Sequence, residues 1–264
     1  METELPDGRA GGGGLADWCF EPTAHLDQAN LAMEDAAAGS LSLEEVEMLT
    51  TALVRMVQRL CRRRHVESPE DVADFLLHVL RHALQIFQLA IDTPAPAPLL
   101  VDAARLLERL LDPTRELYLY ACANYQWTAE AESAGGALAV DDHWTPPLAR
   151  QLLNELAASG GFGTIARVLS RGVLSLPAMG HVLQAVDAGS SVLDPSFAER
   201  ACGAVAAGAS AALGSAGEAV LVEGDGVSRE ILMELLSLVH RLRVEEAASV
   251  EEVRCGSTEG GRWP

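Results

Sequence analysis

The sequence contains no lysine: all 19 of its basic residues are arginine. A Walker-type phosphate loop requires a lysine after its second glycine, so this class of nucleotide site is excluded. Catalysis through a lysine Schiff base is excluded for the same reason. Alanine, glycine and arginine, whose codons are rich in G and C, are all abundant, so the base composition of the gene is the simplest cause of the missing lysine.

Positive charge is scarce, and aromatic side chains are few. The 264 residues carry 38 acidic side chains against 19 basic ones, which gives a formal net charge of −19, and aromatic residues make up 5%. A phosphate backbone or an anionic membrane surface attracts clustered cations, so neither nucleic acid nor membrane is predicted as a partner. Hydrophobic residues make up 49%, which suffices for a core and excludes wholesale disorder.

Cysteine is sparse, and membrane-like segments are missing. The cysteines lie far apart without a CxxC pair, which favours reduced thiols and a cytoplasmic protein over a disulfide framework or a zinc site. No cationic region followed by an apolar stretch opens the chain, so no secretory signal is expected. The most membrane-like stretch, Ala201–Gly217, consists mainly of alanine, glycine and serine, and it is too short and too weakly hydrophobic to predict a transmembrane helix.

The hydrophobic pattern is helical almost throughout. Between residues 43 and 60 apolar side chains recur every three or four positions, and further stripes of this period follow along the chain. Proline and glycine mark the boundaries, because proline cannot continue a helix and glycine caps one. The pattern predicts about nine helices, mostly of roughly ten to twenty residues. They are expected over 43–60, 69–90, 99–111, 113–121, 145–159, 162–170 and 175–188, with two more that open at Asp194-Pro195 and at Ser228.

These helices predict an all-α fold. Helix pairs recur at intervals of roughly forty residues, which favours an armadillo- or HEAT-like helical solenoid, with a compact helical bundle as the alternative. The helical-repeat region is expected to span residues 18–253. A glycine-rich disordered leader over 1–17 and a disordered tail over 254–264 are expected on either side.

Two arrangements have both a chemical and a structural interpretation. His78 and His82 are four residues apart on one predicted helix, but a catalytic zinc needs a third ligand, and a partly exposed helix face with an Asp74–His78 pair explains the spacing. Gly160–Thr164 is rich in glycine and precedes a predicted helix, as a phosphate-binding loop does. No strand precedes it, so a helix-to-helix turn that anchors Phe162 in the core is favoured.

A thiol nucleophile is the remaining enzymatic possibility. Cys122 could work with His143 or His181 as a base, but a small buried side chain is its more ordinary role on an apolar helix. We therefore predict no catalytic residue, no metal ligand and no cofactor.

Positive charge concentrates at one place, the end of the 43–60 helix. Arg59, Arg62, Arg63 and Arg64 lie in and after its last turns, where cations complement the helix dipole, and Arg55 lies one turn earlier. These arginines are the candidate partner-binding site, suited to an acidic peptide. The alternative is a solvated helix end whose arginines pair with nearby glutamates.

The segment from Trp144 to Leu169 reads WTPPLARQLLNELAASGGFGTIARVL. It resembles a segment from the N-terminal armadillo-like region of the large fat-facets-type ubiquitin-specific proteases. There a tryptophan leads into a helix that carries Leu-Leu-Asn, and Gly-Phe and another helix follow. The matching positions are Trp144, Leu152, Leu153, Asn154, Gly161 and Phe162.

The resemblance implies a structural role for these residues. In that family the segment lies far from the protease domain, and the catalytic cysteine and histidine boxes do not occur here. The chain is therefore expected to be a non-catalytic scaffold of a deubiquitinating enzyme, which binds proteins such as substrates or adaptors of the ubiquitin pathway. Two alternatives stay open: a free-standing armadillo-type adaptor and an unrelated helical-bundle enzyme.

Overall fold

The computed structural model describes residues 26–60, 69–112, 147–190, 193–223 and 226–256, and every regular element within them is an α-helix. The predicted all-α fold is therefore confirmed for this part of the chain. The helices are α1 (Leu26–Ala37), α2 (Leu43–Leu60), α3 (Pro69–Asp92), α4 (Ala97–Leu111), α6 (Pro147–Ala158), α7 (Gly161–Ser170), α8 (Leu176–Ser190), α9 (Pro195–Glu223) and α10 (Gly226–Gly256). The predicted leader over 1–17 and the predicted helix over 113–121 lie outside the described residues.

Most predicted boundaries lie close to the observed ones, and the capping residues explain why. The carbonyl of Ser175 accepts a hydrogen bond from the amide of Met179 at 2.9 Å, and α8 starts directly after it. At the start of α9, Asp194 Oδ1 accepts the amide of Phe197 at 3.2 Å, as an N-cap does. After α6, Gly160 has φ 71°, a conformation that residues with a Cβ rarely adopt.

One helix was not predicted from the sequence. Residues 26–37 form α1, although the pattern did not predict a helix there. α1 buries only Leu26, Ala29 and Met33, and its other residues, which include Asp27, Glu34 and Asp35, are exposed or half-buried. Such a short apolar stripe is a weak signal against a charged background.

The ends of α10 and the lengths of two helices differ from the prediction. α10 begins at Gly226, two residues before the predicted Ser228, and it continues to Gly256. α9 and α10 have 29 and 31 residues, which exceeds the expected ten to twenty because no proline interrupts them. Among the described helices none is both long and apolar enough to cross a membrane.

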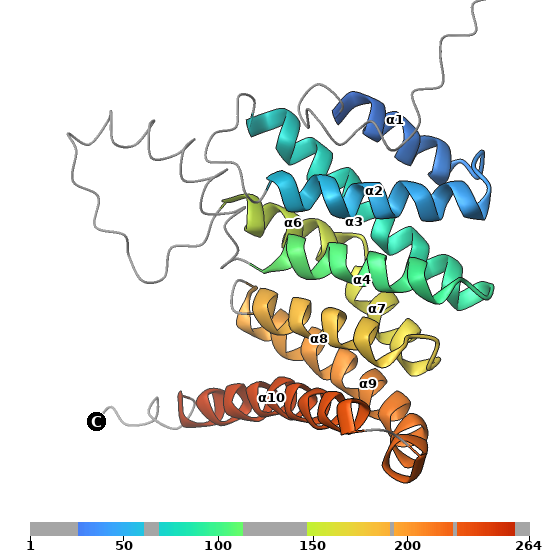
Figure 1. The fold of residues 1–264 in the computed structure, drawn as a ribbon. Helices are drawn as coiled ribbons and strands as arrows, with labels where there is room; N and C mark the ends of the chain where they lie inside the picture. The colour runs from blue at the N-terminus through green and yellow to red at the C-terminus, as the bar shows by residue number, and fades with distance from the viewer. Residues whose placement is uncertain (1–25, 61–68, 113–146, 191–192, 224–225, 257–264) are drawn as a thin grey trace, which may run out of the picture.

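The described helices stack in two layers (Figure 1). α2, α4, α8 and α10 lie side by side in that order and form one layer, and α1, α3, α7 and α9 form the other. The turns between α1 and α2, α3 and α4, and α7 and α8 all lie at the same end of the stack, on the right in Figure 1. Helices within a layer therefore run in the same direction, and the two layers run in opposite directions. α6 packs against α3, α4 and α7.

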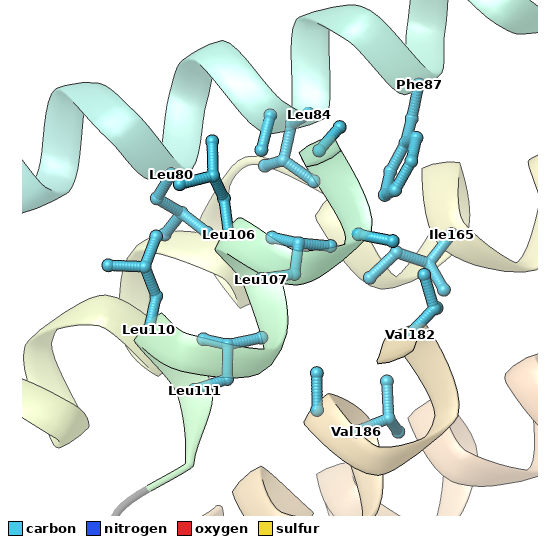
Figure 2. Close-up of a cluster of buried hydrophobic side chains, with 14 of the residues drawn as sticks. Leu80, Leu84, Phe87, Leu106, Leu107, Leu110, Leu111, Ile165, Val182 and Val186 are labelled. Atoms are coloured by element: carbon cyan, nitrogen blue, oxygen red, sulfur yellow. The ribbon is translucent and has the colours of Figure 1, made fainter. Parts of the chain in front are cut away.

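The core lies between the layers, and Figure 2 shows its centre, where α3, α4, α7 and α8 meet. α4 is covered by neighbours in its own layer and by α3 behind it, so eight of its 15 residues are buried. Burial of each large side chain of this kind stabilises the fold by about 1.5–3 kcal/mol. The labelled side chains are Leu80, Leu84 and Phe87 of α3, Leu106, Leu107, Leu110 and Leu111 of α4, Ile165 of α7, and Val182 and Val186 of α8.

The turn between α6 and α7 is held by glycine and phenylalanine. A Cβ at Gly161 would collide with the side chain and the carbonyl oxygen of Leu156, so the two helices meet more closely there than any other residue allows. Phe162 is 5% exposed and packs edge-to-face on Phe197 of α9, with ring centroids 5.7 Å apart at 68°. The predicted anchoring of Phe162 in the core is confirmed.

α7 and α9 approach each other closely through small residues. A Cβ built on Gly208 of α9 would lie 2.5 Å from the carbonyl oxygen of Ala166 in α7. A carbonyl oxygen within a helix cannot move without distorting that helix, so only glycine fits at position 208. Gly214 lies two turns further along α9 and has no atom within 4 Å of a Cβ at its position.

Gly208→Ala should lower the free energy of unfolding by about 1–3 kcal/mol, the usual cost of overpacking. The matched control, Gly214→Ala in the same helix, should be neutral or stabilising by up to about 1 kcal/mol, because alanine favours the helix. Urea denaturation followed by circular dichroism measures both. Equal effects of the two substitutions would show that α7 and α9 are not in backbone contact.

Candidate protein-interaction face

His78 and His82, the two candidate metal ligands, have different environments in the structure. His78 lies on the partly exposed side of α3, and its Nδ1 is 2.9 Å from the backbone oxygen of Asp74, so the expected Asp74–His78 contact exists through the main chain. His82 is 2% exposed and points into the protein. In the part of the chain that the structure describes, no three His, Cys, Asp or Glu side chains gather as a metal site would require.

His82 makes a buried hydrogen bond between the layers. Its Nε2 lies 3.0 Å from Thr50 Oγ1, and the Thr50 hydroxyl donates to the carbonyl of Val46 at 2.7 Å. A hydroxyl has one proton, so Nε2 must be the donor to Thr50. Burial removes the water that would stabilise a charged imidazole, and it lowers the pKa of His82 to about 4. His82 therefore stays neutral and serves as a structural donor.

The residues that carry the family resemblance are mostly packed inside. Leu152 and Leu153 of α6 are buried, as are Gly161 and Phe162 of α7, whereas Asn154 is exposed. They form the α6–α7 turn and bring no reactive group together. Trp144, Cys122 and His143 lie outside the described residues.

His181, the other candidate base, is paired with a carboxylate. Its Nδ1 lies 2.6 Å from Glu108 Oε2, and both side chains are largely covered. The contact joins α8 to α4, so it links two neighbouring helices of one layer.

Equivalent contacts continue along the same layer. Thr51 of α2 donates to Asp102 Oδ2 of α4 at 2.8 Å, and Arg241 of α10 donates to Asp187 Oδ2 of α8 at 2.8 Å. With the Glu108–His181 pair, polar side chains thus connect α2, α4, α8 and α10 in succession. We call the solvent side of these four helices the interaction face.

The Thr51–Asp102 hydrogen bond also sets the register of α2 against α4. Both helices run in the same direction, because each begins at the same end of the stack (Figure 1). Residues one turn beyond Thr51 therefore lie beside residues one turn beyond Asp102. The axes of packed helices are about 8–10 Å apart, so such residues are close neighbours on the surface.

This register places four arginines at neighbouring levels of α2 and α4. Arg55 and Arg59 follow Thr51 on α2, and Arg105 and Arg109 follow Asp102 on α4. At about 1.5 Å per residue, Arg105 lies almost level with Arg55, and Arg109 almost level with Arg59. Arg109 is half-buried and the other three are exposed. We call these four residues the arginine patch.

The structure adds Arg105 and Arg109 of α4 to the predicted arginine cluster. Arg59 belongs to the patch, whereas Arg62, Arg63 and Arg64 lie outside the described residues. The expected pairing with nearby glutamates is absent for Arg55, which makes no ion pair with any described residue. Glu45 instead accepts from the amide and the hydroxyl of Ser42 at 2.7 Å, at the opposite end of α2.

One helix of the opposite layer, α9, has little chemistry along its middle. The exposed positions there are Ala204, Ala207, Ala211 and Gly214, which carry no group that can select a partner. The interaction face has polar contacts between every two neighbouring helices, so it is our candidate for recognition.

Comparison with known proteins identifies no relative: no family model, no curated protein and no solved structure matches this chain. The functional argument therefore rests on the geometry of the interaction face.

Acidification should destabilise the fold through His82. Between about pH 6.5 and pH 4 the unfolded histidine binds a proton that the folded one does not, so the free energy of unfolding falls as the pH falls through this window. Lowering the pH from 7 to 5 should cost about 2 kcal/mol by this route.

Urea denaturation at the two pH values measures the loss, and His82→Leu should remove about that much of the pH dependence. His78→Leu, one turn away on the same helix, is the matched control and should leave the pH dependence close to that of the unsubstituted protein. An unchanged pH dependence in His82→Leu would contradict the buried, neutral histidine.

Proposed function

We propose that this chain is a non-catalytic, armadillo-type helical-repeat scaffold that binds segments of other proteins along the interaction face. The observation that carries the proposal is the run of contacts Thr51–Asp102, Glu108–His181 and Asp187–Arg241, which links the four parallel helices of the interaction face one to the next. A surface of this kind presents many shallow contacts in a row. It suits an extended partner better than a small substrate.

The stacking of the helices supports the repeat assignment. Each helix of a layer packs on the next helix of the same layer: α2 packs on α4, α4 on α8, and α8 on α10. Stacked helical units bury their apolar sides against the units before and after them. Residues 147–190, which contain α6, α7 and α8, make a three-helix unit of about 44 residues, within the range of armadillo and HEAT units.

The contacts of the two candidate reactive histidines support a binding role. His82 is buried and holds Thr50, and His181 is held by Glu108, so both histidines serve contacts between helices. A cytoplasmic location is part of the same proposal, because the cysteines lie far apart and form no CxxC pair.

A link to deubiquitination rests on the resemblance of the segment from Trp144 to Leu169. We propose that the chain corresponds to the armadillo-like region of a fat-facets-type ubiquitin-specific protease, with the free-standing adaptor as the alternative. Leu152, Leu153 and Phe162 support this only as packing residues of the α6–α7 turn. The purified chain should therefore form no adduct with ubiquitin vinyl sulfone, and a covalent adduct would disprove the non-catalytic role.

Selection from a library of random peptides displayed on phage tests the binding role. Peptides that bind the purified chain should lose affinity at least about tenfold when a tryptophan covers the interaction face, either at Gln58 of α2 or at Gln184 of α8. Gln151→Trp, at an exposed position of α6, is the matched control and should leave binding unchanged. Selected peptides whose affinity is unchanged by Gln58→Trp and by Gln184→Trp would refute the interaction face as the binding surface.

A further inference from the structure

We infer that the arginine patch holds an acidic segment of a partner protein in an extended conformation, with glutamate or aspartate at alternate positions. This inference rests on the proposed function and names the partner chemistry of the same face. It is carried by three features of the patch: two arginines without an ion pair to any described residue, the spacing of the arginines, and the surroundings and charge of the patch.

The first feature is that two guanidinium groups lack an acidic partner. Arg55 on α2 and Arg109 on α4 make no ion pair with any residue that the structure describes, although the chain has 38 acidic residues against 19 basic ones. Within the part of the chain that the structure describes, these two guanidinium groups are open to a carboxylate from a ligand. Arginine also binds carboxylates with paired N–H donors, which makes it selective for this group.

The second feature is the spacing. Arg55 and Arg59 are four residues apart, so they are separated by about 6 Å along α2, and the same holds for Arg105 and Arg109 on α4. Side chains on one face of an extended chain repeat every two residues, at about 6.6–6.8 Å. Two successive carboxylates at alternate positions of an extended peptide would therefore lie beside the first pair of arginines, Arg55 and Arg105, and then beside the second pair.

The third feature is the width and the surroundings of the patch. The two arginine rows belong to helices about 8–10 Å apart, so an extended peptide can lie between them and be reached from both sides. Asp102 already accepts from Thr51 and pairs with Arg105, and Glu108 lies 2.6 Å from Nδ1 of His181, so both carboxylates have partners within the protein.

A longer polyanion fits this surface less well than a short acidic segment. The molecule carries a net charge of −19, which repels a nucleic acid or an anionic bilayer over its length. A peptide with three carboxylates contacts only the patch, so it gains the local attraction with less of the general repulsion.

Fluorescence anisotropy with a labelled peptide of alternating serine and glutamate tests the inference. The sequence Ser-Glu-Ser-Glu-Ser-Glu-Ser should bind several-fold more tightly than a peptide of the same composition with its three glutamates in a row. The double variant Arg55→Gln/Arg109→Gln should weaken binding about tenfold, because two exposed ion pairs are lost. Added salt should weaken binding to the unsubstituted protein.

The matched control is Arg171→Gln/Arg200→Gln, which removes the same charge from two exposed arginines outside the patch. This variant should bind the alternating peptide within about twofold of the unsubstituted protein. Equal losses in the two double variants would overturn the inference, because attraction would then follow net charge and not the patch. The inference would also be overturned if single-stranded oligothymidylate or phosphatidylserine vesicles bound at the patch more tightly than the alternating peptide does.

The phage selection separates this inference from the proposed function. Peptides that depend on Gln58 and Gln184 but neither contain acidic residues nor respond to Arg55→Gln/Arg109→Gln would leave the scaffold role intact and refute the acidic partner.

Discussion

The structure depends on one constraint: each apolar helix side must be covered by its neighbours in two layers. α4 shows this most clearly, because α2 and α8 flank it and α3 lies behind it, which leaves only a narrow stripe in contact with water. Burial of this kind is the main favourable contribution to folding. The layer order follows from it, since a helix with apolar residues on three sides is stable only inside a stack.

The same constraint decides where function can lie. Side chains that cannot be buried are confined to the stripe that each helix shows to solvent, and in a layer of parallel helices these stripes lie next to one another. Thr51, Asp102, Glu108 and His181 lie on such stripes, and so does the arginine patch. Thus a surface for recognition arises as a consequence of stacking. His82, on the covered side of α3, is instead kept neutral as a packing residue.

The sequence predicted the helices well and the contacts between them poorly. Boundaries at Ser175, Asp194 and Gly160 could be read because capping is local, and Phe162 could be placed because its turn is local too. α1 was missed because three buried side chains are a faint signal. The arginine patch could not be predicted in full, because Arg55 and Arg105 lie on different helices and only the register of α2 on α4 brings them together.

A direct test of the account is the distance between the first and last helices of the interaction face. Spin labels at Arg55 of α2 and Glu234 of α10, introduced through a non-canonical amino acid, can be measured by double electron–electron resonance. Two helices intervene, so the stacked layers predict a separation of roughly 25–35 Å. A separation below about 20 Å would mean that α2 and α10 close into a compact bundle, and it would contradict the continuous face on which the proposed function rests.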